Sequence, residues 1–101
     1  MDKTELKRKT QAFAEDVIKF IETLPDTRAV RVVSHQLLRS STSVGANYRS
    51  ACKAKSTADF INKTIIVEEE ADESIYWLEL IEQTVSTDGI KLAVLKKKQT
   101  S

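Results

Sequence analysis

The chain has 101 residues, of which 31% are charged, and its formal net charge is only +1. This length fits one domain over residues 1–101, with a core that is only marginally large enough for a stable monomer. The near-neutral charge excludes a general attraction to nucleic acid, so any such binding would need charge segregated on one face.

The first helix is expected over residues 3–24, because residues on one buried face recur at steps of three and four. These residues are Leu6, Thr10, Phe13, Val17, Phe20, Ile21 and Leu24. Pro25 ends the helix, since proline cannot continue the backbone hydrogen-bond ladder. We expect Asp26 or Thr27 to cap the next helix.

The second helix is expected over residues 27–54, because the same spacing continues across Gly45, although glycine costs about 1 kcal/mol relative to alanine in a helix. Its core stripe holds Val30, Val33, Leu37, Ser41, Val44, Tyr48 and either Ala51 or Cys52. A second, mostly basic stripe holds Arg31, His35, Arg39, Thr42, Ala46, Arg49 and Lys53. A third stripe is small and polar, with Gln36, Ser40, Ser43, Asn47 and Ser50. Small residues spread along a helix favour close packing of another helix.

The third helix is expected over residues 57–86, after a capping box formed by Ser56 and Asp59. Its predicted core face carries Phe60, Thr64, Val67, Ala71, Ile75, Leu78, Ile81 and Val85. A turn over residues 86–89 then leads to a short fourth helix over residues 89–98. No segment alternates with a period of two. The predicted fold is therefore all-α, an antiparallel up-and-down helical bundle with three long helices plus a short fourth.

We expect the core to be formed by residues from all three long helices. These are Phe13, Val17, Leu37, Val44, Tyr48, Phe60, Ala71 and Leu78. The opposite side of the third helix carries a second apolar stripe with Ile66, Glu69, Glu73, Trp77 and Leu80, and with Tyr76 beside it. A bundle of this size has one core, so this stripe predicts a subunit interface, where Trp and Tyr are favoured. The alternative is that the aromatic residues simply lie along the bundle surface.

The run from His35 to Ile81 resembles the bacterial four-helix-bundle family of 23S rRNA intervening-sequence proteins. The recognisable elements are Gln36-Leu37-x-Arg39, then Ser43 and Asn47, then the acidic run that ends in YWLEL at residues 76–80. The resemblance covers about residues 6–82. It implies a small bundle that assembles into ring-like homopentamers. The similar accessory protein of diversity-generating retroelements implies RNA, DNA or a nucleic-acid enzyme as a partner.

The basic stripe of the second helix has two interpretations. Arg39 and Arg49, with Asn47, could face the acidic residues of the third helix across a subunit boundary, because Arg suits bidentate pairing with carboxylates. The stripe could instead bind phosphates, and for this role the candidates are Arg31, His35, Lys53 and Lys55.

Metal, cofactor and catalytic sites are not expected. The only histidine, His35, has no Glu three residues before it, as a di-iron bundle would require. Cys52 lies at the edge of the core stripe, where a free cysteine usually acts as a small hydrophobe. We therefore expect a non-catalytic protein, and the apolar stripe of the third helix predicts that it self-assembles. The family resemblance implies a role as a scaffold or adaptor associated with rRNA or another nucleic acid. The alternatives are a pure protein–protein interaction module and a small enzyme that uses Cys52.

The compartment is expected to be the cytoplasm, without a membrane partner. The N-terminal segment MDKTELKRKT is charged and lacks the apolar region of a signal peptide. No run approaches the roughly 20 apolar residues of a membrane span. The single cysteine excludes an internal disulfide and agrees with a reducing environment.

Overall fold

The computed structural model describes residues 2–85, which form three helices and no strand, so the prediction of an all-α chain is confirmed for this part. The helices are α1 (Lys3–Glu22), α2 (Arg28–Cys52) and α3 (Thr57–Thr84). Each ends two residues earlier than expected from the sequence. The predicted fourth helix over residues 89–98 lies outside the described residues.

Each helix begins at a polar side chain that caps a free backbone N–H. Asp2 Oδ1 accepts from Glu5 N at 2.7 Å, and Thr27 Oγ1 accepts from Val30 N at 3.2 Å. Ser56 Oγ accepts from Asp59 N at 3.1 Å, which is one half of the predicted capping box. The Asp59 carboxylate lies 3.3 Å from Lys63 Nζ, one turn further along. These caps account for where the chain enters each helix.

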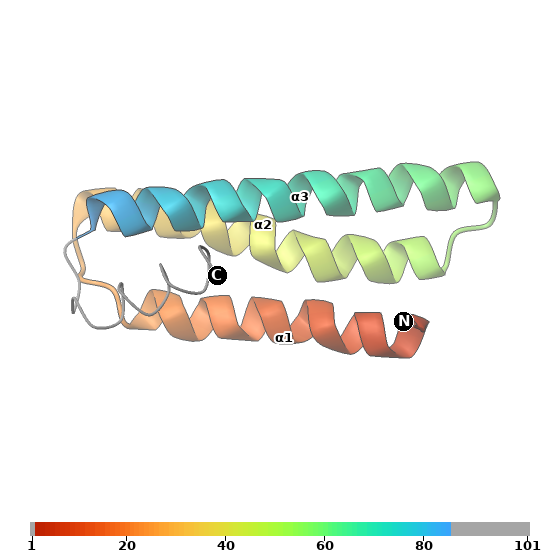
Figure 1. Ribbon diagram of the computed structural model, residues 1–101, viewed down its shortest axis with the longest axis horizontal. Helices are drawn as coiled ribbons and strands as arrows, with labels where there is room; N and C mark the ends of the chain where they lie inside the picture. Colours follow the sequence, from red (N-terminus) through yellow and green to blue (C-terminus); the bar gives the residue numbers. More distant parts are fainter. Residues whose placement is uncertain (1, 86–101) are drawn as a thin grey trace.

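The three helices lie side by side, and the chain reverses direction at each connection (Figure 1). α2 packs along both other helices, whereas α1 and α3 share few contacts among the described residues. The core cluster of Val17, Leu37 and Ile81 takes one residue from each helix. Phe13 and Leu78, two predicted core residues, pack against this cluster without being fully buried. α2 is therefore the central element of the fold.

The side of α3 that meets α2 matches the predicted core face only in part. Ile81, which was predicted, is buried on this side, and so is Ser74, which was not. Phe60 and Ile75, which were expected in the core, are 37% and 48% exposed. α3 carries large apolar residues on more than one side, so their spacing does not identify the side that packs.

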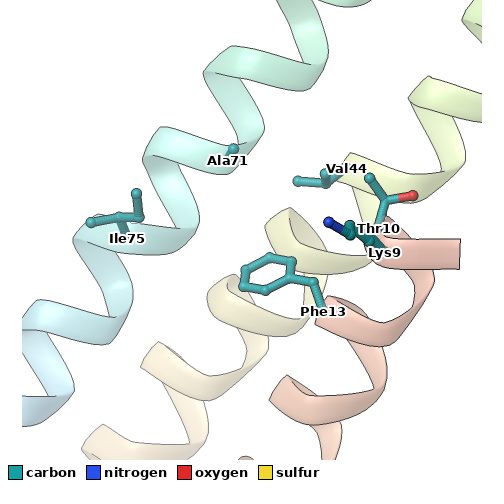
Figure 2. Close-up of a pocket in the computed structure, with 6 residues that line it drawn as sticks. All are labelled: Lys9, Thr10, Phe13, Val44, Ala71 and Ile75. Atoms are coloured by element: carbon teal, nitrogen blue, oxygen red, sulfur yellow. The ribbon is translucent and has the colours of Figure 1, made fainter. Parts of the chain in front are cut away.

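The predicted core residues Val44 and Tyr48 are buried as expected. Ala71 is half-buried and contributes, with Ile75, to a groove between α1 and α3. Phe13 of α1, Val44 of α2 and Ile75 of α3 surround a hollow of about 280 Å³ there (Figure 2). This groove explains why part of the predicted core face of α3 is exposed.

Candidate interaction surfaces

Arg39 of α2 binds two carboxylates of α3 in its own chain. Its Nη2 forms a close ion pair with Glu73 Oε2, and its Nη1 lies 3.7 Å from Glu70 Oε1. Its Nε donates to Gln36 Oε1 at 3.4 Å. The sequence predicted that Arg39 pairs with the acidic residues across a subunit boundary. The structure differs, because α2 and α3 of one chain are close enough to make the pair.

Asn47, predicted at the subunit interface, is half-buried and bonds within its own helix. Its Nδ2 donates to the Ser43 carbonyl at 2.9 Å and to Ser43 Oγ at 2.8 Å. The spacing of four residues between Ser43 and Asn47 thus has a local explanation, since such a pair lies on one side of a helix.

The predicted assembly stripe of α3 is divided between the surface and the core. Ile66 and Tyr76 are 39% and 55% exposed, and Glu69 is exposed as well. Trp77, in contrast, packs against the core cluster, which corrects its predicted position on the far side of the helix. The correction follows from the rotation of α3, which presents the side near Ser74 to α2.

The half-buried members of this stripe lie at the edge of the α2–α3 contact. Leu80 is half-buried, and Trp77 contacts the exposed Tyr76 edge to face, with ring centroids 4.9 Å apart. Trp77 Nε1 is buried and has no hydrogen-bond acceptor among the described residues. On α3, the exposed part of the predicted interface is therefore Ile66, Glu69 and Tyr76.

Arg49 faces α1 and not α3. Its Nη2 donates to Gln11 Oε1 at 2.7 Å, and Gln11 Nε2 donates to Glu15 Oε2 at 3.0 Å. The pairing of Arg49 with acidic residues of α3 was predicted across a subunit boundary, and it stays a prediction. Within its own chain, Arg49 lies on the side of α2 that packs against α1.

The four predicted nucleic-acid-binding residues are all exposed but form two separate groups. Arg31 and His35 lie near the start of α2, and Arg31 Nε is 3.5 Å from Asp26 Oδ1. Lys53 and Lys55 follow the end of the same helix. At 1.5 Å per helical residue, the two groups are roughly 30 Å apart. They do not form one compact site.

The cations at the start of α1 were not among the predicted nucleic-acid-binding residues. Lys3, Lys7 and Arg8 lie at the same end of the molecule as Arg49 and Lys55. Lys7, Arg8 and Arg49 line one hollow, and Lys3 and Lys55 line another. The basic segment at residues 7–9 was visible in the sequence. Its neighbours on α2 were not, because about forty residues separate them along the chain.

Cys52, the candidate nucleophile of the enzyme alternative, is half-buried at the end of α2. It lines a hollow of about 380 Å³ with Lys3 and Lys55. Burial raises the pKa of the nearby Tyr48 phenol, and the Cys52 thiol and the Asp2 carboxylate raise that pKa further. Cys52 therefore neighbours the Tyr48 phenol and lines the same hollow as two lysines.

Within residues 2–85, no three side chains of the His, Cys, Asp and Glu types come close enough together to hold a metal ion. None of the helices α1 to α3 combines the length and apolar character that crossing a membrane requires.

Known proteins match the chain over nearly its whole length. The family described as 23S rRNA-intervening sequence protein matches residues 2–100. The chain is also similar to a protein of unknown function from the S23 ribosomal protein family of Bacteroides thetaiotaomicron VPI-5482, solved at 1.70 Å resolution. The two are 38% identical, with 99% of this chain and 89% of that chain covered and a TM-score of 0.81. No curated protein matches the chain.

Proposed function

The chain belongs to the 23S rRNA-intervening sequence protein family, and on this premise we propose that it is a non-catalytic cytoplasmic protein that self-assembles and associates with nucleic acid. Membership confirms the resemblance drawn from residues 35–81. The family description refers to ribosomal RNA, so RNA is the first nucleic acid to test.

The observation that carries this proposal is the separation of charge between the helices. α2 contains four arginines and no acidic residue. The acidic residues of α3 are Asp59, Glu68, Glu69, Glu70, Asp72, Glu73, Glu79 and Glu82. Lys63 is the single basic residue of that helix. A net charge of +1 therefore hides a basic helix and an acidic helix, and nucleic-acid binding would need such a segregation of charge.

Self-assembly is supported by the apolar residues that α3 exposes. Ile61, Ile65 and Tyr76 are each about half exposed, and Ile66 is 39% exposed. Exposed apolar residues gathered on one helix favour a protein contact. The family resemblance adds the expectation of a ring of five chains. Opposite charges on α2 and α3 would favour contact between copies that present different helices to each other.

The short fourth helix belongs to the same proposal. Residues 90–95 read IKLAVL, and three lysines follow at residues 96–98. With this helix, the chain would complete the antiparallel four-helix bundle that the sequence predicts.

A second candidate function is a protein–protein interaction module with no nucleic-acid role. The observation in its favour is that Arg39 already pairs with Glu70 and Glu73, which removes one cation from the basic side. The remaining acidic residues of α3 would then attract a basic partner protein.

An RNA titration distinguishes the two candidates. Fluorescence anisotropy of a labelled RNA fragment should report binding whose affinity falls at least tenfold between about 50 and 200 mM salt, because bound cations release counterions from the phosphates. Binding that is absent, or that does not change with salt, would contradict the nucleic-acid proposal and favour the protein-interaction module. A fully acidic peptide of similar length, with the same label, serves as the control ligand.

A further inference from the structure

A hollow of about 330 Å³ lies between the first half of α1 and the second half of α2. Lys7 and Arg8 line it from α1, and Arg49 lines it from α2. We propose that this hollow binds one phosphate group of a nucleic-acid backbone. The inference rests on the proposed function and names the place where the contact is made.

The cations of the hollow are not neutralised within the described part of the chain. In residues 2–85, the ion pairs involve Lys9, Arg31, Arg39 and Lys63. Lys7, Arg8 and Arg49 take no part in them. Glu15 is the one carboxylate among the lining residues. Three cations drawn together from two helices repel one another, and an anion between them would relieve this repulsion.

Arg49 is held in place by a chain of two hydrogen bonds. Glu15 accepts from Gln11 Nε2 at 3.0 Å, which directs the amide oxygen of Gln11 to Arg49 Nη2 at 2.7 Å. This bond uses one of the roughly five N–H donors of a guanidinium and leaves the others for an anion. A guanidinium fixed in this way suits the fork geometry of a phosphate. Gln11 is thus a positioning residue.

A second basic hollow continues the first. It is lined by Lys3, next to Thr4 of the first hollow, and by Cys52, one turn beyond Arg49. Lys55 also lines it. Two adjacent basic hollows favour a ligand with repeated negative charges over a single carboxylate, so we assign the hollow to a nucleic-acid phosphate and not to a side chain of a second copy.

The first test uses variants in the RNA anisotropy assay. Arg49→Gln and Lys7→Gln should each weaken binding by about tenfold and reduce the slope of log affinity against log salt by about one. Gln11→Ala should weaken binding by about threefold without changing this slope, because no cation is lost. Lys19→Gln, an exposed lysine at the other end of α1, is the matched control and should change the affinity less than twofold. Thermal melts establish that every variant is folded.

The second test needs no nucleic acid. NMR of the full chain should show saturable shifts of the Arg49 side-chain N–H and the Gln11 amide with inorganic phosphate, compared with chloride at equal ionic strength. If the wild type shows these phosphate shifts but does not bind RNA, the proposed function is refuted and the hollow remains a phosphate-binding site. If RNA binds with equal losses in Arg49→Gln and Lys19→Gln, or with no loss in Arg49→Gln, the assignment of the phosphate contact to this hollow is wrong, whereas the proposed function stands. A lower assembly mass for Arg49→Gln, with unchanged RNA affinity, would assign the hollow to a second copy and overturn the inference.

Discussion

Ser74 Oγ of α3 lies 2.9 Å from Ser40 Oγ of α2, and both residues have no exposed surface. Ser74 donates this bond, and Ser40 in turn donates to the Leu37 carbonyl at 3.2 Å. Ser40 Oγ is therefore an acceptor for Ser74 at the point where the helices are in contact, and the Glu70 carbonyl of α3 also lies 2.9 Å from Ser74 Oγ. Serine is used here because it is small enough for close packing and can bond across the contact.

Enlarging this contact should separate the helices. We expect Ser74→Leu to lower the free energy of unfolding by about 1–3 kcal/mol, because a well-packed interior has no room for the added atoms. Ser74→Ala should cost about 1 kcal/mol, the value of one buried hydrogen bond. Denaturant unfolding followed by circular dichroism measures both, at one fixed protein concentration. Thr42→Leu, on the exposed side of α2, is the control. An equal loss in the control would show that the α2–α3 contact is not tightly packed.

Gly45 should accept a methyl group but not a larger side chain. A Cβ there would lie 3.5–3.6 Å from Thr10 atoms of α1, an ordinary contact distance, and the glycine has no positive φ. We expect Gly45→Ala to stabilise the protein by about 0.5–1 kcal/mol, because alanine is the better helix former. Gly45→Leu should destabilise it by about 1–3 kcal/mol through overpacking. In thermal melts, the alanine variant should have a higher melting temperature than the wild type. A lower melting temperature would show that α1 lies too close to Gly45 to leave room for a methyl group.

The contact between Arg39 and Glu73 should stabilise the single chain. Because both side chains are partly exposed, a double-mutant cycle with Arg39→Ala and Glu73→Ala should give a coupling energy of about 0.5–1 kcal/mol that decreases with added salt. The assembly mass should stay the same in both variants. A coupling seen only as a change of assembly mass would mean that the pair forms between subunits, as the sequence predicted.

The titration of Tyr48 should report its burial. The pKa of this phenol is raised in the folded chain, so its contribution to the free energy of unfolding is complete below about pH 10 and is lost as pH rises toward the folded-state pKa. In a Tyr76→Phe background Tyr48 is the single tyrosine. Its phenolate absorbance should then appear at higher pH in buffer than in concentrated guanidinium chloride. Coinciding titration curves would show that the phenol is exposed to solvent.

The helices could be predicted from the sequence because their signals are local. Pro25 and the capping residues Thr27 and Ser56 mark the ends, and apolar spacing marks the long segments between them. The packing side of α3 could not be predicted in the same way. Its most buried residues include Ser74, which no apolar pattern would select, while Ile75 beside it is half exposed.

The interaction surfaces depend on contacts between distant parts of the chain. Arg39 was correctly expected to meet acidic residues of α3, since its stripe is basic and α3 is acidic. Whether that contact lies within one chain depends on the rotation of the helices, which the spacing does not give. The rotation of α2 also directs Arg49 toward Gln11 of α1. This contact could not be inferred from the sequence, because 38 residues separate the two residues.

The most direct test of assembly and RNA binding is the solution mass of the full chain, measured by light scattering behind a sizing column with absorbance at the nucleic-acid and protein maxima. We expect a mass near five times the chain mass of 11.4 kDa, and binding of added RNA to the same peak at low salt. A monomer that elutes apart from the RNA would contradict both the assembly through α3 and the nucleic-acid surface of α1 and α2.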